Sequence, residues 1–323
     1  MKHSAEIDQS LLKLIQALGI ENIEEIVSGV KKFDIQVFKV YDFVPDMLLT
    51  VRSYLVNQNF KHRFGNVKTV ENGILFSFHN FFKDKLDNDI QHSVIEEIPH
   101  VRIIPMTSSQ EYSFYKNTHM KHISVLVSAD YLKGFLKEDA SKFAYLLNAE
   151  ESFVIEEFMG DEILQTVNEI VGGQKEKSLS EFYYRLKALE LLYLLFRSLD
   201  KREQTSFQSI SPAEIEMVYK VRDKLITRLD EAPSLAALKD IACMNEIKLR
   251  KLFAQIFGMG IYEYFQFIRM KEAGRQLTET GKNVSEVGYD LGFTNLSHFS
   301  REFEKYIGMK PKKFQKHNCC SIN

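Results

Sequence analysis

The stretch "GFTNLSHFSREFEKYIGMKPKKF", residues 292–314, carries the pattern that decides the interpretation of this chain. Its apolar residues Leu296, Phe299 and Phe303 are three and four positions apart, which places them on one face of a helix. The polar residues between them point the other way: Ser297, Ser300 and Arg301. Such an outer face, followed by a lysine cluster, is typical either of a solvated helix or of a helix that lies in a DNA groove.

Charge is divided unevenly along the chain. The 323 residues have a formal net charge of −2. From Ser211 onward there are 18 Lys and Arg against 14 Asp and Glu, a net charge of +4, which leaves −6 on residues 1–210. An acidic first part joined to a basic last third is typical of a regulatory domain followed by a DNA-binding domain.

Composition and termini narrow the class of protein. The length allows two domains, and an apolar content of 45% is enough for each to bury a core. The three cysteines form no zinc-binding spacing and indicate a reducing compartment. The N-terminus has no secretory h-region, and the longest apolar stretch, 191–196, is too short to cross a bilayer. We therefore expect a cytoplasmic protein with no membrane contact.

The first two thirds of the chain change from a β pattern to a helical one. Residues 5–32 have the period of short amphipathic helices. Short runs of alternating apolar and polar residues, typical of strands, follow at 33–44, 47–56, 73–82 and 122–132. After Asp130 the period is helical throughout, and we expect "KNTHMKHIS" at 116–124 to form a solvated turn. The polar segment 205–212 marks a domain boundary.

The segment 178–203 predicts a helix whose apolar face is unusually broad. Its stripe includes Phe182, Leu186, Leu189, Tyr193 and Phe196. So wide a face needs more than one partner surface. Two interpretations stay open: dimerisation through this helix, or packing within the core of its own domain.

The last third has a helical period throughout, with local signals at the helix ends. Pro212 after Ser211 begins the first helix, Asn245 caps a later one that ends at Gly258, and Asn283 or Ser285 caps another. A short helix, a turn and a second helix occur twice, at 235–258 and 284–308. The first helix of such a unit braces the second, which shows its N-terminal half to base edges in the major groove.

Residues 213–317 resemble the DNA-binding domain of the AraC/XylS family of bacterial transcription regulators. The second unit carries most of the family signature: Val284, Val287, Gly292, Phe293, Phe299, Ser300, Arg301, Phe303, Gly308 and Pro311. The connecting helix matches the family at Tyr264, Arg269, Ala273 and Leu277. The resemblance implies two helix-turn-helix subdomains joined by one helix. Where the family often has lysines, this chain has Ala254 and Glu304, and Gly288 replaces a usual alanine.

The resemblance also implies which positions face DNA. In the first recognition helix these are Glu246, Ile247, Arg250 and Lys251, and in the second Leu296, Ser297, Ser300 and Arg301. The two arginines are candidates for bidentate contact to guanine. Ile247 and Leu296 are candidates for thymine methyl groups, although Leu296 packing inward with Phe299 is an equal alternative. At a DNA surface Glu246 would repel phosphate or accept from a cytosine amine, but we favour a first-turn acid on the helix dipole.

The lysines that follow the second unit are candidates for phosphate contacts, because they come directly after a recognition helix. They are Lys310, Lys312, Lys313 and Lys316, with Lys312 chosen for the predicted site.

No enzyme class is indicated. The histidines at 62, 79, 92, 100, 119 and 122 form neither HxH nor HExxH, and neither a P-loop, GxSxG nor GxGxxG occurs. We expect no catalytic residues, no metal site and no cofactor.

The expected protein is thus α+β. A β-rich, cupin-like regulatory domain spans 1–204 (strands over 35–130, helices over 131–203), a linker spans 205–212, and two helix-turn-helix subdomains with their connecting helix span 213–317. The resemblance implies a transcription activator with double-stranded DNA and RNA polymerase as partners, and a small-molecule effector on the first domain. A weaker likeness to the siderophore-responsive branch makes a siderophore one candidate effector. The alternative function is an effector-independent, DNA-bound protein whose first domain recruits another protein.

Overall fold

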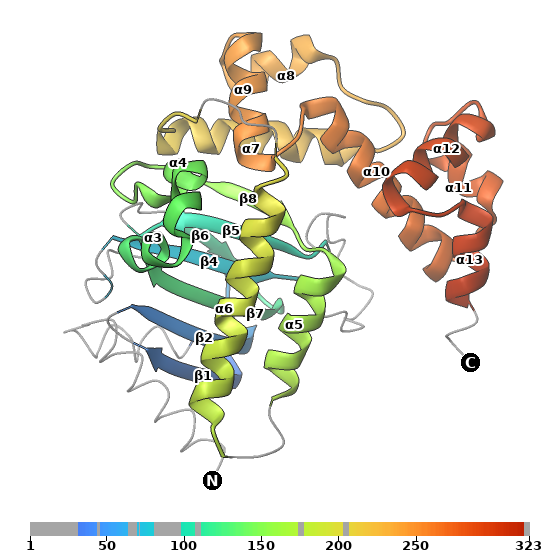
Figure 1. The fold of residues 1–323 in the computed structure, drawn as a ribbon. Helices are drawn as coiled ribbons and strands as arrows, with labels where there is room; N and C mark the ends of the chain where they lie inside the picture. Colours follow the sequence, from blue (N-terminus) through green and yellow to red (C-terminus); the bar gives the residue numbers. More distant parts are fainter. Residues whose placement is uncertain are drawn as a thin grey trace. The chain divides into compact units, whose positions relative to one another are not determined.

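The computed structural model describes residues 32–43, 46–63, 70, 72–80, 98–106, 111–173, 178–202 and 207–319. The helices predicted within residues 5–32 lie outside the described residues, apart from Lys32. The described chain has two compact units, drawn in Figure 1. The first contains the described residues up to Asp84 and from Pro99 to Pro212, and the second contains Ile98 and the described residues from Ala213 onward.

The first unit is built on strands. They are β1 (Phe33–Phe43), β2 (Met47–Val56), β3 (Phe60–Arg63), β4 (Gly73–His79), β5 (His100–Pro105), β6 (Glu111–Phe114), β7 (His119–Ser128) and β8 (Ile155–Phe158). Six of them form an antiparallel sheet in the order β1-β2-β7-β4-β5-β8, and β3 pairs with β6 in a second, two-stranded sheet. The chain returns from β2 to β7 by way of other strands, so the central pairing is set by residues distant in sequence.

Helices complete the first unit. They are α3 (Ala129–Leu136), the 3₁₀ helix η2 (Lys137–Phe143), α4 (Ala144–Leu147), α5 (Asp161–Gly172) and α6 (Ser180–Leu199). In Figure 1, α5 and α6 lie side by side across one face of the larger sheet. That face supplies the core.

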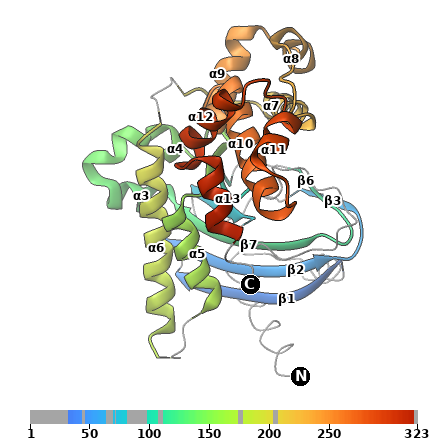
Figure 2. The same cartoon turned by 90° about the vertical axis from the view of Figure 1, so that its right-hand side faces the viewer.

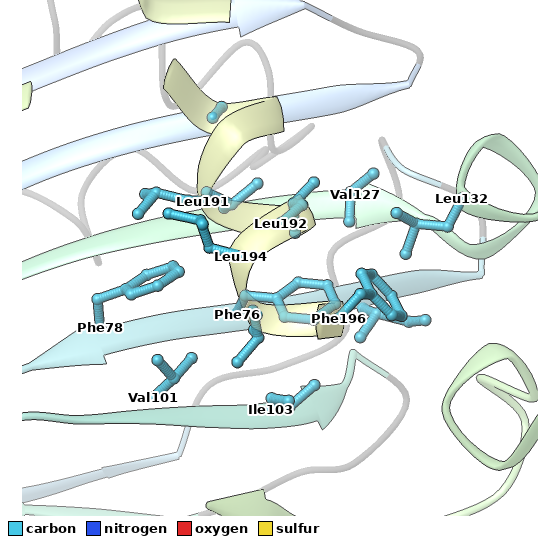
Figure 3. Packing of buried hydrophobic residues seen from close by; sticks show 14 of the residues in the cluster. Phe76, Phe78, Val101, Ile103, Val127, Leu132, Leu191, Leu192, Leu194 and Phe196 are labelled. Atoms are coloured by element: carbon cyan, nitrogen blue, oxygen red, sulfur yellow. The ribbon is translucent and has the colours of Figure 1, made fainter. Parts of the chain in front are cut away.

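The core of the first unit follows from the alternation of strand side chains. Phe76 and Phe78 of β4 and Val101 and Ile103 of β5 are buried, together with Leu191, Leu192 and Phe196 of α6. Figure 3 shows these aromatic and branched side chains of the sheet facing those of the helix. Aromatic rings thus fill much of this core.

Four predicted strands are confirmed, as β1, β2, β4 and β7. Two expectations were wrong. The segment from Asp130 to residue 203 is not purely helical, because β8 pairs antiparallel with β5. "KNTHMKHIS" is not a solvated turn, because His119–Ser128 is a strand between β2 and β4 in which His122 is buried.

The predicted helix at 178–203 is α6, but its stripe is divided between two environments. Phe196 and the leucines near it face the sheet. Three other members of the stripe remain exposed: Phe182, Leu186 and Tyr193. The structure therefore supports core packing for one side of α6 and leaves an apolar outer side.

The second unit is entirely helical in the part that the structure describes. Its helices are α7 (Pro212–Thr227), α8 (Leu235–Ala242), α9 (Glu246–Phe257), α10 (Ile261–Glu279), α11 (Val284–Asp290), α12 (Leu296–Ile307) and α13 (Pro311–Cys319). α10 contacts α9, α11, α12 and α13, and Figure 2 shows these helices from a second direction. Across the described ranges, no helix has the length and apolar character needed to cross a membrane.

Candidate nucleic-acid interface

Helix α9 begins after a polar capping residue, Asn245, and ends at a glycine, Gly258. The side-chain oxygen of Asn245 accepts a hydrogen bond from the Lys248 amide at 2.9 Å, which satisfies a free N–H group of the first turn. Gly258 ends the helix with φ of 71°, and its N–H donates to the carbonyl of Ala254 at 2.8 Å. Both ends agree with the sequence interpretation.

Helix α12 repeats this construction fifty positions later. Asn295 accepts from the amides of Ser297 and His298 at 2.9 and 3.1 Å, and Gly308 ends the helix with φ of 84°. Both helices have 12 residues. Position 247 therefore corresponds to 297, 250 to 300 and 251 to 301.

Each of these helices buries one face and leaves the other open. In α9 the buried side chains include Leu249 and Phe253, and in α12 Phe299 and Phe303. These pairs occupy equivalent positions and pack into the hydrophobic cores of the two helix-turn-helix units. The outward faces are thus fixed by the packing of the inward ones.

On α12, the outward face is polar and centred on two predicted residues. Ser297 and Arg301 are exposed, and Ser300 is half-buried at the edge of this face. His298 is also exposed, one position from Ser297, and sequence reasoning passed over it. Because His298 precedes Arg301 by three residues, helical spacing was the signal that would have identified it.

Leu296 belongs to the packed side of α12. A Cβ atom on Gly288 of α11 would lie 2.7 Å from Leu296 Cδ2 and 3.2 Å from Phe299 Cδ1. The leucine is half-buried above this glycine. Of the two alternatives for Leu296, the structure has the inward-packed one. The absence of a Cβ atom at Gly288 leaves room for this packing.

On α9, the outward face carries a charge pair and an apolar residue. Ile247 is 81% exposed. Arg250 Nε donates to Glu246 Oε1 at 2.9 Å, and both side chains are close to half exposed or more. Lys251 is half-buried. Lys248, the equivalent of His298, forms an ion pair with Glu214 of α7 at 2.5 Å.

The lysine cluster lies on and just before α13, which is anchored to the second unit. The Gln315 side chain donates to the carbonyl of Lys282 at 2.7 Å, and the Phe314 ring packs against Gly274 of α10. Lys312 is exposed, as are Lys310, Lys313 and Lys316. The cluster thus directly follows α12 on a helix of fixed position.

Arg269 of α10 holds the turn between α11 and α12. It is only 8% exposed, its Nε donates to the Leu291 carbonyl at 2.8 Å, and its Nη2 donates to the same oxygen. Its guanidinium lies 3.9 Å from the centre of the Phe293 ring. Burial lowers the pKa of this guanidinium, yet arginine remains charged in proteins. The sequence marked Arg269 as a family position but not this role.

Comparisons with known proteins agree with this geometry. Residues 238–317 match a family described as a helix-turn-helix domain. The regulatory protein PchR of Pseudomonas aeruginosa is 35% identical over 105 residues, which cover 32% of this chain and 36% of that protein. The transcriptional activator RhaR of Escherichia coli is 27% identical over 161 residues, 49% of this chain and 56% of that protein. The chain therefore spans about a third to just over half of the length of these curated relatives.

Solved structures give similar matches. The DNA-binding domain of AdpA, in complex with a target DNA, is 20% identical, with a TM-score of 0.30 over 35% of this chain and 97% of that chain. ToxT from Vibrio cholerae is 14% identical, with a TM-score of 0.30 over 84% of this chain and 98% of that chain. The sequence match and the helix geometry agree that residues 238–317 are a helix-turn-helix domain. The two named relatives are a regulatory protein and a transcriptional activator.

Proposed function

We propose that the chain is a sequence-specific DNA-binding regulator of transcription, in which α9 and α12 each enter a major groove. The observation that carries the proposal is the repeated construction of these helices. Both have 12 residues, an Asn cap, a Gly end and one buried face, and both contact α10. At 1.5 Å per residue, the 19-residue α10 is about 28 Å long, comparable with the roughly 34 Å between successive major grooves on one face of DNA.

The exposed side chains give each helix a different set of contacts. Arg301 has no ion-pair partner among the described residues and serves as the guanine-binding residue of α12, with Ser297 and Ser300 beside it. Ile247 meets a thymine methyl group, and Lys251 and Lys312 bind phosphate. We assign Leu296 to support of the helix and not to base contact.

Arg250 can exchange its present partner for a base. An exposed ion pair four residues apart on a helix contributes only about 0.3–0.5 kcal/mol. A bidentate arginine–guanine contact contributes about 1–3 kcal/mol of discrimination. Breaking the ion pair with Glu246 therefore costs less free energy than the arginine–guanine contact supplies. Glu246 thus orients Arg250 in the absence of DNA and does not prevent Arg250 from binding a base.

The first unit is proposed to regulate the second in response to a small-molecule effector, in a cytoplasmic activator that works with RNA polymerase. The relative RhaR is named a transcriptional activator, which supports activation of transcription over repression. The exposed Phe182, Leu186 and Tyr193 of α6 support a homodimer through that helix. A second copy would bury the apolar outer side of α6 that the first unit leaves open.

Selection from genomic fragments tests the proposal. The full chain is incubated with a fragment pool, and bound DNA is sequenced for wild type, Arg301→Ala, Arg250→Ala and Lys312→Ala. We expect a repeated motif in which each arginine variant relaxes different base positions, while Lys312→Ala weakens all sequences alike and reduces the salt dependence. Lys133→Ala, an exposed lysine of α3 in the first unit, serves as the matched control. Binding without a motif, equally sensitive to every variant, would contradict sequence-specific recognition.

A thermal-shift screen separates effector control from recruitment of another protein. The full chain is tested against metabolites and siderophores. Stabilisation by a member of the panel supports an effector, and a panel without any stabilising compound supports recruitment.

A further inference from the structure

The two faces of the six-stranded sheet differ in chemistry. One face packs against α5 and α6 and is apolar. On the opposite face, cross-strand register brings polar residues of five strands together, and we call them the polar cluster: Thr50, Arg52, Ser77, His79, His100, Arg102, His122, Ser124 and Glu156. In the centre of a small sheet, such a set is far from the usual apolar filling.

Direct contacts connect the members of the polar cluster. Arg52 is opposite His122 in the register of β2 and β7, and its Nη2 donates to Ser124 Oγ at 2.7 Å. The ring of His79 lies 5.6 Å from that of His122 and 5.3 Å from that of His100, measured between centroids. The cluster is therefore continuous across β2, β7, β4 and β5.

The centre of the cluster has unused hydrogen-bonding capacity. His122 is 7% exposed and Thr50 6%. Both ring nitrogens of His122 and the hydroxyl of Thr50 are buried without a partner among the described residues. Buried polar atoms without partners are unfavourable by about 1–3 kcal/mol each and are rare in native proteins. Each is explained if a bound molecule supplies the missing partner.

Protonation and charge define what kind of molecule fits. Burial, with Arg52 and His79 nearby, holds the pKa of His122 well below its usual value, so its ring is neutral and has one donor and one acceptor nitrogen. The polar cluster contains two arginines and one carboxylate, Glu156, which is bonded to Arg102 at 2.8 Å. Guanidinium groups beside neutral hydrogen-bond donors favour an anion with further hydrogen-bonding capacity.

Apolar side chains adjoin the polar cluster on both sides along the strands. Tyr54 packs edge-on to His122, with ring centroids 5.6 Å apart, and belongs to a cluster with Val56 and Phe114. Leu48 and Leu126 lie toward the other end of β2 and β7. A ligand bound at the centre of the polar cluster would contact both the Arg52 guanidinium and these apolar side chains.

We propose that the polar cluster binds a small organic anion, a carboxylate carried on an apolar body, held by Arg52, His122 and Thr50. The inference rests on the proposed function, since this anion would be the effector of the first unit. A metal ion is a poorer fit, because within the described ranges no three His, Cys, Asp or Glu side chains are arranged to hold one. Arg52 supplies charge and a fork of donors for the carboxylate.

Thermal unfolding of the full chain tests the proposal with matched probes. Hexanoate and phenylacetate are compared with hexanamide and phenylacetamide, which have the same bodies without the charge. At ten times its Kd, a carboxylate is expected to raise Tm by about 3–6 °C, and the amides are not. Arg52→Gln is expected to abolish the shift. Arg197→Gln, on α6, retains it because Arg197 bonds Glu162 across the helix layer and does not belong to the polar cluster.

Two variants test the site without any ligand. Thr50→Val and His122→Leu remove buried polar atoms that lack partners, so the ligand-free protein is expected to keep or raise its Tm. A fall of several degrees in both would show that these groups stabilise the fold, and would overturn the proposal. So would a panel in which neither carboxylate raises Tm, or in which Arg52→Gln responds like wild type.

Parallel DNA-binding measurements keep the two proposals separable. DNA selection by wild type with no carboxylate response overturns this inference alone and favours recruitment. A carboxylate response in a chain that selects no DNA contradicts the proposed function and leaves the site in place.

Discussion

Gly292→Ala would place a methyl group where the structure has a backbone carbonyl. A Cβ atom at this position would lie 1.9 Å from the carbonyl oxygen of Asp230, and the φ of Gly292 is +75°. A left-handed backbone costs an L-residue about 1–2 kcal/mol. Forcing packed atoms apart adds about 1–3 kcal/mol, because the obstacle is main chain and not the end of a flexible side chain. We expect the free energy of unfolding of the second unit to fall by about 2–5 kcal/mol.

Gly281 provides the matched control for this substitution. Its φ is +70°, but a Cβ atom there would meet nothing within 4 Å. Gly281→Ala should therefore show the backbone cost alone, about 1–2 kcal/mol. The assay is urea unfolding of the full chain followed by far-ultraviolet circular dichroism, with stability taken from the midpoint and slope. Equal losses in the two variants would refute the reasoning, since the Asp230 carbonyl would then yield without cost.

Three further outcomes are expected from the same measurements. Gly288→Ala should change stability by less than about 1 kcal/mol, because a gain in helix propensity of about 1 kcal/mol opposes displacement of the leucine side chain above it; a loss above about 2 kcal/mol would contradict this. Arg269→Met should cost about 2–4 kcal/mol through the lost bonds to the Leu291 carbonyl and the lost ring contact, and a neutral effect would refute the anchoring role. Burial holds the pKa values of His79 and His122 well below the usual 6.5, so the unfolded chain binds more protons than the folded one at acidic pH. The free energy of unfolding of the first unit should therefore fall by up to about 1.4 kcal/mol per histidine for each pH unit below about 6.5. His122→Gln should reduce this slope.

Local chemistry explains why much of the second unit was predictable from sequence. Asn245 and Gly258 bound α9 through contacts with neighbours only a few positions away, and such contacts are encoded in the sequence itself. Asn283, one of two candidates, is the cap of α11, and Glu286 completes a capping box with it. Helix phase was harder, because the side on which Leu296 packs depends on the absence of a Cβ atom in another helix, at Gly288.

One missed contact was within reach of sequence reasoning. Glu246 and Arg250 are four residues apart on a helix, a spacing that brings opposite charges together. The sequence interpretation assigned the two residues separate roles. The pairing changes the expected energetics of Arg250 at a base edge.

The first unit was less predictable because its contacts are distant in sequence. β8 is only four residues long, and its strand conformation depends on pairing with β5. The paired residues Arg102 and Glu156 are 54 positions apart in the sequence. His122 was misplaced for a similar reason, since its burial depends on Arg52 and His79 on the flanking strands. Alternation along one strand indicates two faces but not what covers each.

The fifty-residue repeat has a consequence for the geometry of regulated promoters. A symmetric dimer with identical recognition helices binds a palindromic site, whose sequence is the same in both directions. Here the two recognition helices, α9 and α12, belong to one chain and differ at corresponding outward positions. Position 247 is Ile where position 297 is Ser, and position 251 is Lys where position 301 is Arg. On the proposed function, a single bound molecule reads a sequence with a direction, and inverting that sequence turns the whole protein around. The orientation of the site relative to the transcription start would then be part of the signal, as its distance is.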